Sequence, residues 1–95
     1  DQAFNRYMNV VYTFVNEQAE RSPDSVVWFT RAAFGAAALK EKERNWQEAV
    51  QVYERVVEEA VPAQDEARKR IDKIRNDNWL LFEQAEEMNH VGIDG

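Results

Sequence analysis

The chain of 95 residues contains no cysteine, one histidine, two prolines and three glycines. Without cysteine it has no disulfide, no thiolate metal site and no thiol nucleophile. So few prolines and glycines leave few interruptions, which favours long helices, and no segment shows the strict alternation typical of a strand. The sequence has no run of 18 apolar residues, so we expect no membrane insertion.

The chain is acidic, with a formal net charge of −6. This charge argues against nucleic-acid binding, which needs a basic surface. A content of 44% hydrophobic and 32% charged residues is typical of a soluble folded chain, here one domain with a core of modest size. The chain starts at Asp1 rather than Met and carries no signal peptide, which indicates a processed protein or a fragment. The compartment stays open between cytoplasm and cell envelope.

The clearest pattern lies between residues 45 and 62. Apolar residues recur there at the spacing of one helix face, with polar residues between them: Trp46, Ala49, Val50, Tyr53, Val56, Val57 and Ala60. Asn45 is a typical helix cap and Glu48 follows it as in a capping box. Pro62 cannot continue a helix. The pattern therefore predicts a helix with a defined start and end.

Three further helices are predicted, over residues 2–21, 24–43 and 63–88, followed by a flexible tail over residues 89–95. The first should bury a stripe that includes Phe4, Met8, Val11, Tyr12 and Val15. In the second, twelve of the fourteen residues from Val26 to Leu39 are apolar or glycine, so we expect it to be the most buried helix. Its many small residues should allow neighbouring helices to approach closely. In the fourth, Ala67, Ile71, Ile74, Leu81 and Ala85 share a face.

Ala49, Tyr53, Val56 and Pro62 follow one another as in the second helix of a tetratricopeptide repeat, and Ala36 stands where the first helix usually has leucine. The chain resembles that family over about a third of its length. The resemblance implies an all-α fold of about four helices, in which antiparallel hairpins stack as a right-handed superhelix over residues 1–88. Ala33, Lys40 and the exact position of Pro62 depart from the family pattern.

The resemblance also implies a function, since such repeats bind other proteins. We expect a scaffold or adaptor domain that takes a partner peptide or helix in a concave groove. The groove positions carried over from the family are Arg31, Phe34, Ala38 and Glu41. Arg31 would pair with an acidic group, and Phe34 either anchors the partner or belongs to the core.

About three repeats are usually needed for a stable stack, and this chain holds fewer. We therefore expect it to be part of a longer array or to form a homo-oligomer. Trp79, Leu80 and Phe82 are candidates for self-association, because they add apolar surface beside the main face of the fourth helix. Alternatively, they fold back onto the first or third helix.

The sequence shows no group of residues typical of a catalytic site, a cofactor site or a metal site. We therefore expect no enzyme, no cofactor and no metal. His90 stands in the tail near Glu86, Glu87 and Asp94, which indicates a solvated segment. A basic cluster, Arg68, Lys69, Arg70, Lys73 and Arg75, is interleaved with acids and is either a patch for an acidic partner or a salt-bridged helix face. Two other functions stay open: a four-helix bundle for dimerisation or regulation, and a non-catalytic helical part of a larger enzyme.

Overall fold

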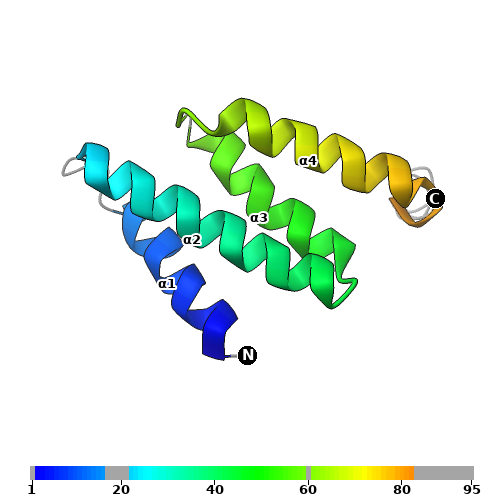
Figure 1. Cartoon of the computed structure of the whole chain (residues 1–95), viewed down its shortest axis with the longest axis horizontal. Coiled ribbons are helices and arrows are strands. Elements are labelled where there is room, and N and C mark those ends of the chain that lie inside the picture. The colour runs from blue at the N-terminus through cyan, green and yellow to red at the C-terminus, as the bar shows by residue number, and fades with distance from the viewer. Residues whose placement is uncertain (1, 17–21, 60, 83–95) are drawn as a thin grey trace, which may run out of the picture.

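The computed structural model describes residues 2–16, 22–59 and 61–82, and in these ranges the chain is helical with no strand. The helices are α1 (Gln2–Asn16), α2 (Pro23–Lys42), α3 (Trp46–Glu58) and α4 (Gln64–Asp77) (Figure 1). A further helical turn covers residues 79–82. The predicted all-α class is therefore confirmed.

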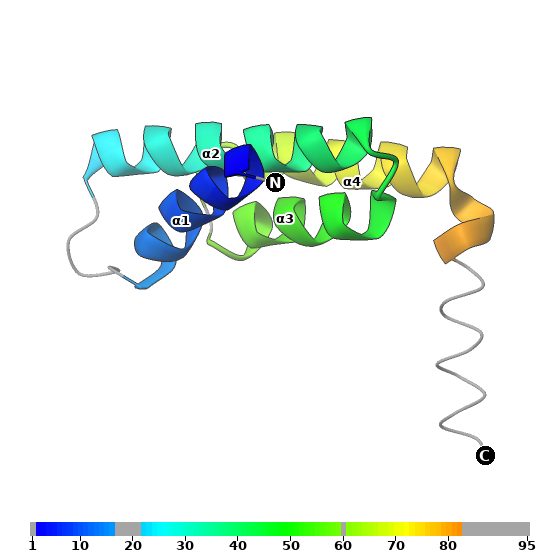
Figure 2. The ribbon, with the colours of Figure 1, turned by 90° about the horizontal axis from the view of Figure 1, so that it is seen from below.

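The helices form two layers. Consecutive helices run in opposite directions, and α2 and α4 lie in one layer while α1 and α3 lie in the other (Figures 1 and 2). α2 packs on both α1 and α3, and α3 also packs on α4. Because consecutive helices lie in alternate layers, the apolar side of each helix is buried against the helix that follows it.

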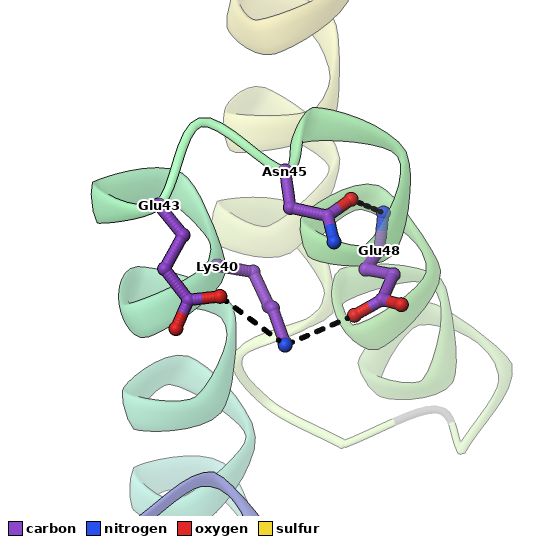
Figure 3. Close-up of polar contacts among 4 residues, drawn as sticks. All are labelled: Lys40, Glu43, Asn45 and Glu48. Atoms are coloured by element: carbon purple, nitrogen blue, oxygen red, sulfur yellow. Dashed lines mark hydrogen bonds and ion pairs between the residues drawn. The ribbon is translucent and has the colours of Figure 1, made fainter. Parts of the chain in front are cut away.

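The helix starts and ends follow local signals in the sequence. Ser22 caps α2 by accepting a hydrogen bond from the backbone of Ser25, and Asn45 caps α3 by accepting from the backbone N–H of Glu48 (Figure 3). α2 ends in a Schellman arrangement, in which the N–H of Asn45 donates to the carbonyl of Lys40 at 2.8 Å and the N–H of Arg44 donates to the carbonyl of Glu41 at 2.9 Å. This arrangement places Arg44 in the left-handed region, at φ 61°.

The contact between α1 and α2 depends on residue size. The rings of Phe14 and Phe29 stack with 4.3 Å between their centroids. The ring of Tyr7 lies so close to Gly35 that a Cβ added there would be 2.9 Å from Cζ of Tyr7. The expected close approach through small residues of α2 is therefore present, and the glycine is required at that point by the aromatic ring.

α3 rather than α2 is the more buried helix, contrary to the sequence-based expectation. Each has five buried residues, but α3 spans 13 positions and α2 spans 20. Both helices pack on two neighbours, but α2, with 20 residues, is longer than α1 with 15 and α3 with 13, so part of it stays uncovered by them. Trp28 is accordingly 62% exposed, and Val27 and Ala38 are also exposed.

The predicted fourth helix is broken by Asn78, so α4 ends at Asp77 instead of Met88. Asn78 leaves helical geometry at φ −129°, and its side-chain amide donates to the carbonyl of Ile74 at 2.9 Å. The break changes the register, so Leu81 is exposed and Phe82 packs on the core instead. Residues 83–88 and the predicted tail lie outside the described residues.

Two smaller expectations for the other helices also change. α1 ends at Asn16 in the described part, and residues 17–21 of the predicted helix lie outside it. Tyr12, expected in the apolar stripe of this helix, is 50% exposed because α1 turns Met8, Val11 and Phe14 toward α2 instead. α3 ends at Glu58, before Pro62.

Candidate protein-interaction surface

The four predicted groove residues lie along α2 at helical spacing, but they differ in exposure. Arg31 and Ala38 are exposed, whereas Phe34 and Glu41 are half-buried. The first pair is therefore available to solvent, and the second pair contacts neighbouring helices. We call Trp28, Arg31, Phe34 and Ala38 the α2 stripe.

Glu41 takes part in a hydrogen-bonded cluster that joins three helices. The hydroxyl of Tyr53 on α3 donates to Oε2 of Glu41 on α2 at 2.6 Å. Arg70 on α4 donates from Nη1 to the same hydroxyl at 3.4 Å, and from Nε to Oε1 of Glu66 at 3.3 Å. Glu41 is therefore a structural acceptor, and its carboxylate is engaged within the domain.

The electrostatics of the cluster keep the phenol of Tyr53 neutral. Burial, followed by the hydrogen bond to Glu41, raises the pKa of Tyr53 to about 12, while the nearby guanidinium of Arg70 acts in the opposite direction. A phenolate beside the carboxylate would place two like charges at hydrogen-bond distance. The hydroxyl therefore stays a donor throughout the physiological pH range.

Phe34 lies between the core and this cluster. Its ring meets Tyr53 edge to face, with centroids 5.4 Å apart, and the guanidinium carbon of Arg70 lies 5.0 Å from its centroid. The sequence left open whether Phe34 is groove or core, and the ring is half-buried and packs against the core. Arg70, which the sequence analysis had placed only in the basic cluster of α4, lies beside this ring.

Arg31 has a different environment. Its guanidinium carbon lies 5.8 Å from the ring centroid of Trp28, one helical turn earlier on α2. In the described part of the chain, no carboxylate lies within ion-pair distance of Arg31. Trp28 was missed as a site residue, although its spacing of three from Arg31 places it on the same side of α2.

Lys40 closes the end of the hairpin between α2 and α3. Its Nζ lies 3.4 Å from Glu43 and 3.1 Å from Glu48 (Figure 3), and 4.3 Å from the ring centroid of Phe4 on α1. The hydrogen bond to Glu48 is the main cause that raises the pKa of Lys40. Lys40 stands where the resembled family often has an aromatic residue, and here its side chain contacts α1, α3 and the cap residue of its own helix.

The basic cluster of α4 is largely paired with acids. Arg68 lies 3.3 Å from Asp65, Lys73 lies 3.4 Å from Asp77, and Arg75 lies 3.6 Å from Glu54 on α3. Such exposed pairs contribute little stability each, but they neutralise the helix face. The geometry favours a salt-bridged face over a patch for an acidic partner.

The three candidates for self-association differ in burial. Trp79 is 60% exposed and Leu80 is also exposed, with Leu81 beside them. Phe82 is half-buried against the core, with the guanidinium carbon of Arg75 5.9 Å from its ring centroid. Phe82 therefore folds back onto the core of the domain, whereas Trp79 and Leu80 remain exposed.

Within residues 2–16, 22–59 and 61–82, no group of three or more histidine, cysteine, aspartate or glutamate side chains is arranged to hold a metal ion. His90 and its acidic neighbours lie outside these ranges. None of the helices in the described part is both long and apolar enough to cross a membrane.

Comparisons with protein-family models, with curated proteins and with solved structures find no match for this chain. The likeness to tetratricopeptide repeats therefore stands on the residues quoted above.

Proposed function

We propose that this chain is a protein-interaction domain of the tetratricopeptide type, and that it binds a partner peptide or helix along the α2 stripe. As a scaffold or adaptor, it acts without catalysis. It forms part of a longer array in which α2–α3 is a complete hairpin, α1 is the second half of the preceding one, and α4 begins the next.

The alternation of helices between two layers supports this arrangement. α2 and α4 share one layer, as do α1 and α3, which is what stacked hairpins require. The right-handed superhelix is part of the same proposal. A closed four-helix bundle would instead bring the first and last helices together.

The observation that carries the binding proposal is the open row of Trp28 and Arg31 beside Phe34. Tryptophan and arginine are enriched among residues that dominate binding energy. Arg31 is exposed and unpaired within the described part, so an acidic group of a partner can reach it without breaking an existing ion pair. The preferred partner therefore carries a carboxylate next to apolar side chains.

The test compares variants that reverse one exposed positive charge on different helices. Arg31→Glu removes the exposed cation of the α2 stripe, whereas Arg6→Glu makes the same change on α1, in the other layer. Both should fold, because both side chains are exposed. In capture from source-cell extract followed by direct titration of the captured protein, we expect Arg31→Glu to weaken binding at least about tenfold. Equal loss in Arg6→Glu would indicate a nonspecific charge effect and contradict the proposal.

Trp79 and Leu80 favour a second candidate, self-association at the end of the described stack. With Leu81, Asp77 and Asn78 they line an open hollow of about 360 Å³. Light scattering over a concentration series should show a dimer that Trp79→Ser/Leu80→Ser abolishes. A chain that stays monomeric at high concentration would contradict this candidate.

A further inference from the structure

An open groove of about 510 Å³ lies between α1 and α3, in the layer that does not carry the α2 stripe. Phe4, Met8 and Tyr12 line it from α1, and Val52 contributes from α3. The three α1 residues are spaced four apart, so they form one ridge along that helix. Tyr12 is the most exposed of them and leaves a large aromatic surface open to the groove.

The α3 side of this groove is acidic. Among the described residues that line it, Glu48, Glu54 and Glu58 are acidic and Arg55 is basic. Glu48 is paired with Lys40 and Glu54 lies 3.6 Å from Arg75. No lysine or arginine of the described segments lies within ion-pair distance of Glu58. The groove thus has an apolar side and a carboxylate-rich side, and Glu58 has no counterion among the residues that the structure describes.

We propose that this groove binds an amphipathic helical segment of a partner protein that carries basic residues on one flank. Two neighbouring helices form a trough into which a third helix can lay its apolar face. Apolar side chains of the segment would contact Met8 and Tyr12, and lysine or arginine side chains would reach Glu58. This surface differs from the α2 stripe in position and in the charge that it prefers, so it goes beyond the proposed function.

Charge decides between a partner helix and a second copy of this chain. The chain has a net charge of −6, so two copies repel each other at a carboxylate-rich rim. The cations of α4 are mostly paired with acids already, so they do not supply a basic flank. The shape also matters, because a groove that is open along two helices suits an extended segment better than an enclosed small molecule.

The test uses two synthetic helical peptides with leucine at identical positions, one with lysine on the flank and one with glutamate there. The 95-residue chain is titrated with each, by fluorescence anisotropy of a labelled peptide and by amide chemical shifts. We expect the lysine peptide to bind at least about tenfold more tightly, with weaker binding at high salt. Shift changes should centre on α1 and α3. Equal affinity for both peptides, or shifts centred elsewhere, would overturn the proposal.

Two matched variants locate the effect. Glu58→Lys reverses a groove charge that has no ion-pair partner in the described segments, and Asp24→Lys reverses an exposed charge at the start of α2, away from the groove. We expect Glu58→Lys to weaken the lysine peptide at least about tenfold and Asp24→Lys to change it by no more than about twofold. Equal losses of peptide affinity in the two variants would mean that the peptide responds only to the net charge of the chain. That result would contradict a binding site in the groove.

Two further controls show whether a loss of peptide binding comes from unfolding or from binding at the α2 stripe. Tyr12→Ser removes the exposed ring without touching a buried residue and should weaken both peptides, and circular dichroism confirms that each variant is folded. Arg31→Glu should leave peptide binding unchanged, because the α2 stripe lies elsewhere. If Arg31→Glu abolishes peptide binding, the peptide occupies the α2 stripe and the inference is wrong, whatever the fate of the proposed function.

Discussion

The hydroxyl of Tyr53 donates a hydrogen bond of 2.6 Å to Glu41, and through it α3 is joined to the end of α2. The side chain of Tyr53 is fully buried, and Arg70 from α4 donates to the same oxygen. One phenol therefore links three consecutive helices. The link is polar and directional and lies at the part-buried edge of the core, so apolar repacking does not replace it.

Removing the hydroxyl should destabilise the domain. In Tyr53→Phe the ring stays in place, but Glu41 and Arg70 lose their shared partner in a half-buried site. We expect the free energy of unfolding to fall by about 1–3 kcal/mol. Urea unfolding followed by circular dichroism measures this loss. Glu41→Gln is the matched control, because it keeps an acceptor for the phenol and should lose less. A Tyr53→Phe curve that overlies the wild type would show that the hydrogen bond is not formed.

The same residue predicts a loss of stability at high pH. The pKa of Tyr53 is raised from about 10 to about 12, so between these values the folded state keeps a proton that the unfolded state releases. The stabilising effect is fully present below pH 10 and disappears as pH rises to 12. The expected loss is on the order of 1–3 kcal/mol. The measured quantity is the difference between wild type and Tyr53→Phe, because contributions common to both proteins cancel in it. A constant difference from pH 8 to pH 12 would refute the assignment.

Arg44 provides a test of backbone conformation. Its φ of 61° lies in the left-handed region, which the Schellman end of α2 requires and which glycine adopts without a steric cost. Arg44→Gly should therefore raise the free energy of unfolding by about 0.5–1 kcal/mol, the relief of strain being partly offset by the greater freedom of the unfolded chain. Arg44→Ala is the control, since alanine keeps the strain. Thermal melts that rank the glycine variant below the alanine variant would contradict this geometry.

α3 could be predicted from the sequence because several local signals agree there. Asn45 caps it, the apolar spacing has one period throughout, and Pro62 prevents its extension. The break in the fourth helix was missed because Leu81 continues the apolar spacing of Ile71 and Ile74, and neither proline nor glycine marks the end. One signal was present: the pair Asn45-Trp46 at the start of α3 recurs as Asn78-Trp79, where the next helical turn begins.

The candidate site was predictable only in part. Helical spacing alone places Arg31 and Ala38 on the outer side of α2, and both are exposed. The engagement of Glu41 was not predictable, because it depends on how α3 brings Tyr53 to the end of α2. Arg70 has a sequence-local partner in Glu66, which masks its contacts with Tyr53 and Phe34 across the helices. Local rules find pairs within one helix, whereas contacts between helices depend on packing.

The packing of α3 predicts the outcome of a size increase. Ala49 is fully buried, so Ala49→Leu should overpack the core and cost about 1–3 kcal/mol. Ala38→Leu is the matched control, because the same change on the exposed side of α2 should alter stability by less than about 0.5 kcal/mol. Chemical unfolding of both variants measures the difference. If the two lose stability equally, Ala49 does not face the other helices as described.

A double-mutant cycle tests the contact between α1 and α2. Gly35 lies inside a helix, where replacement by alanine normally gains about 1 kcal/mol. Here the added Cβ would lie 2.9 Å from the ring of Tyr7, which has to move away and lose its contact. We expect Gly35→Ala to leave the free energy of unfolding nearly unchanged in the wild-type background. In a Tyr7→Ala background it should raise that free energy by the full amount expected for an exposed helix position.

The interaction free energy between the two positions should thus be about 0.5–1 kcal/mol, measured from the unfolding of four proteins. Ala38→Gly, about one turn away at an exposed position of the same helix, serves as a check that the helix responds to glycine in the ordinary way. Tyr7 is the right partner for Gly35 in the cycle, because the three atoms nearest to an added Cβ all belong to its ring. Additive effects of the two substitutions would mean that the ring does not rest on the glycine, and the close approach of α1 and α2 would then need another cause.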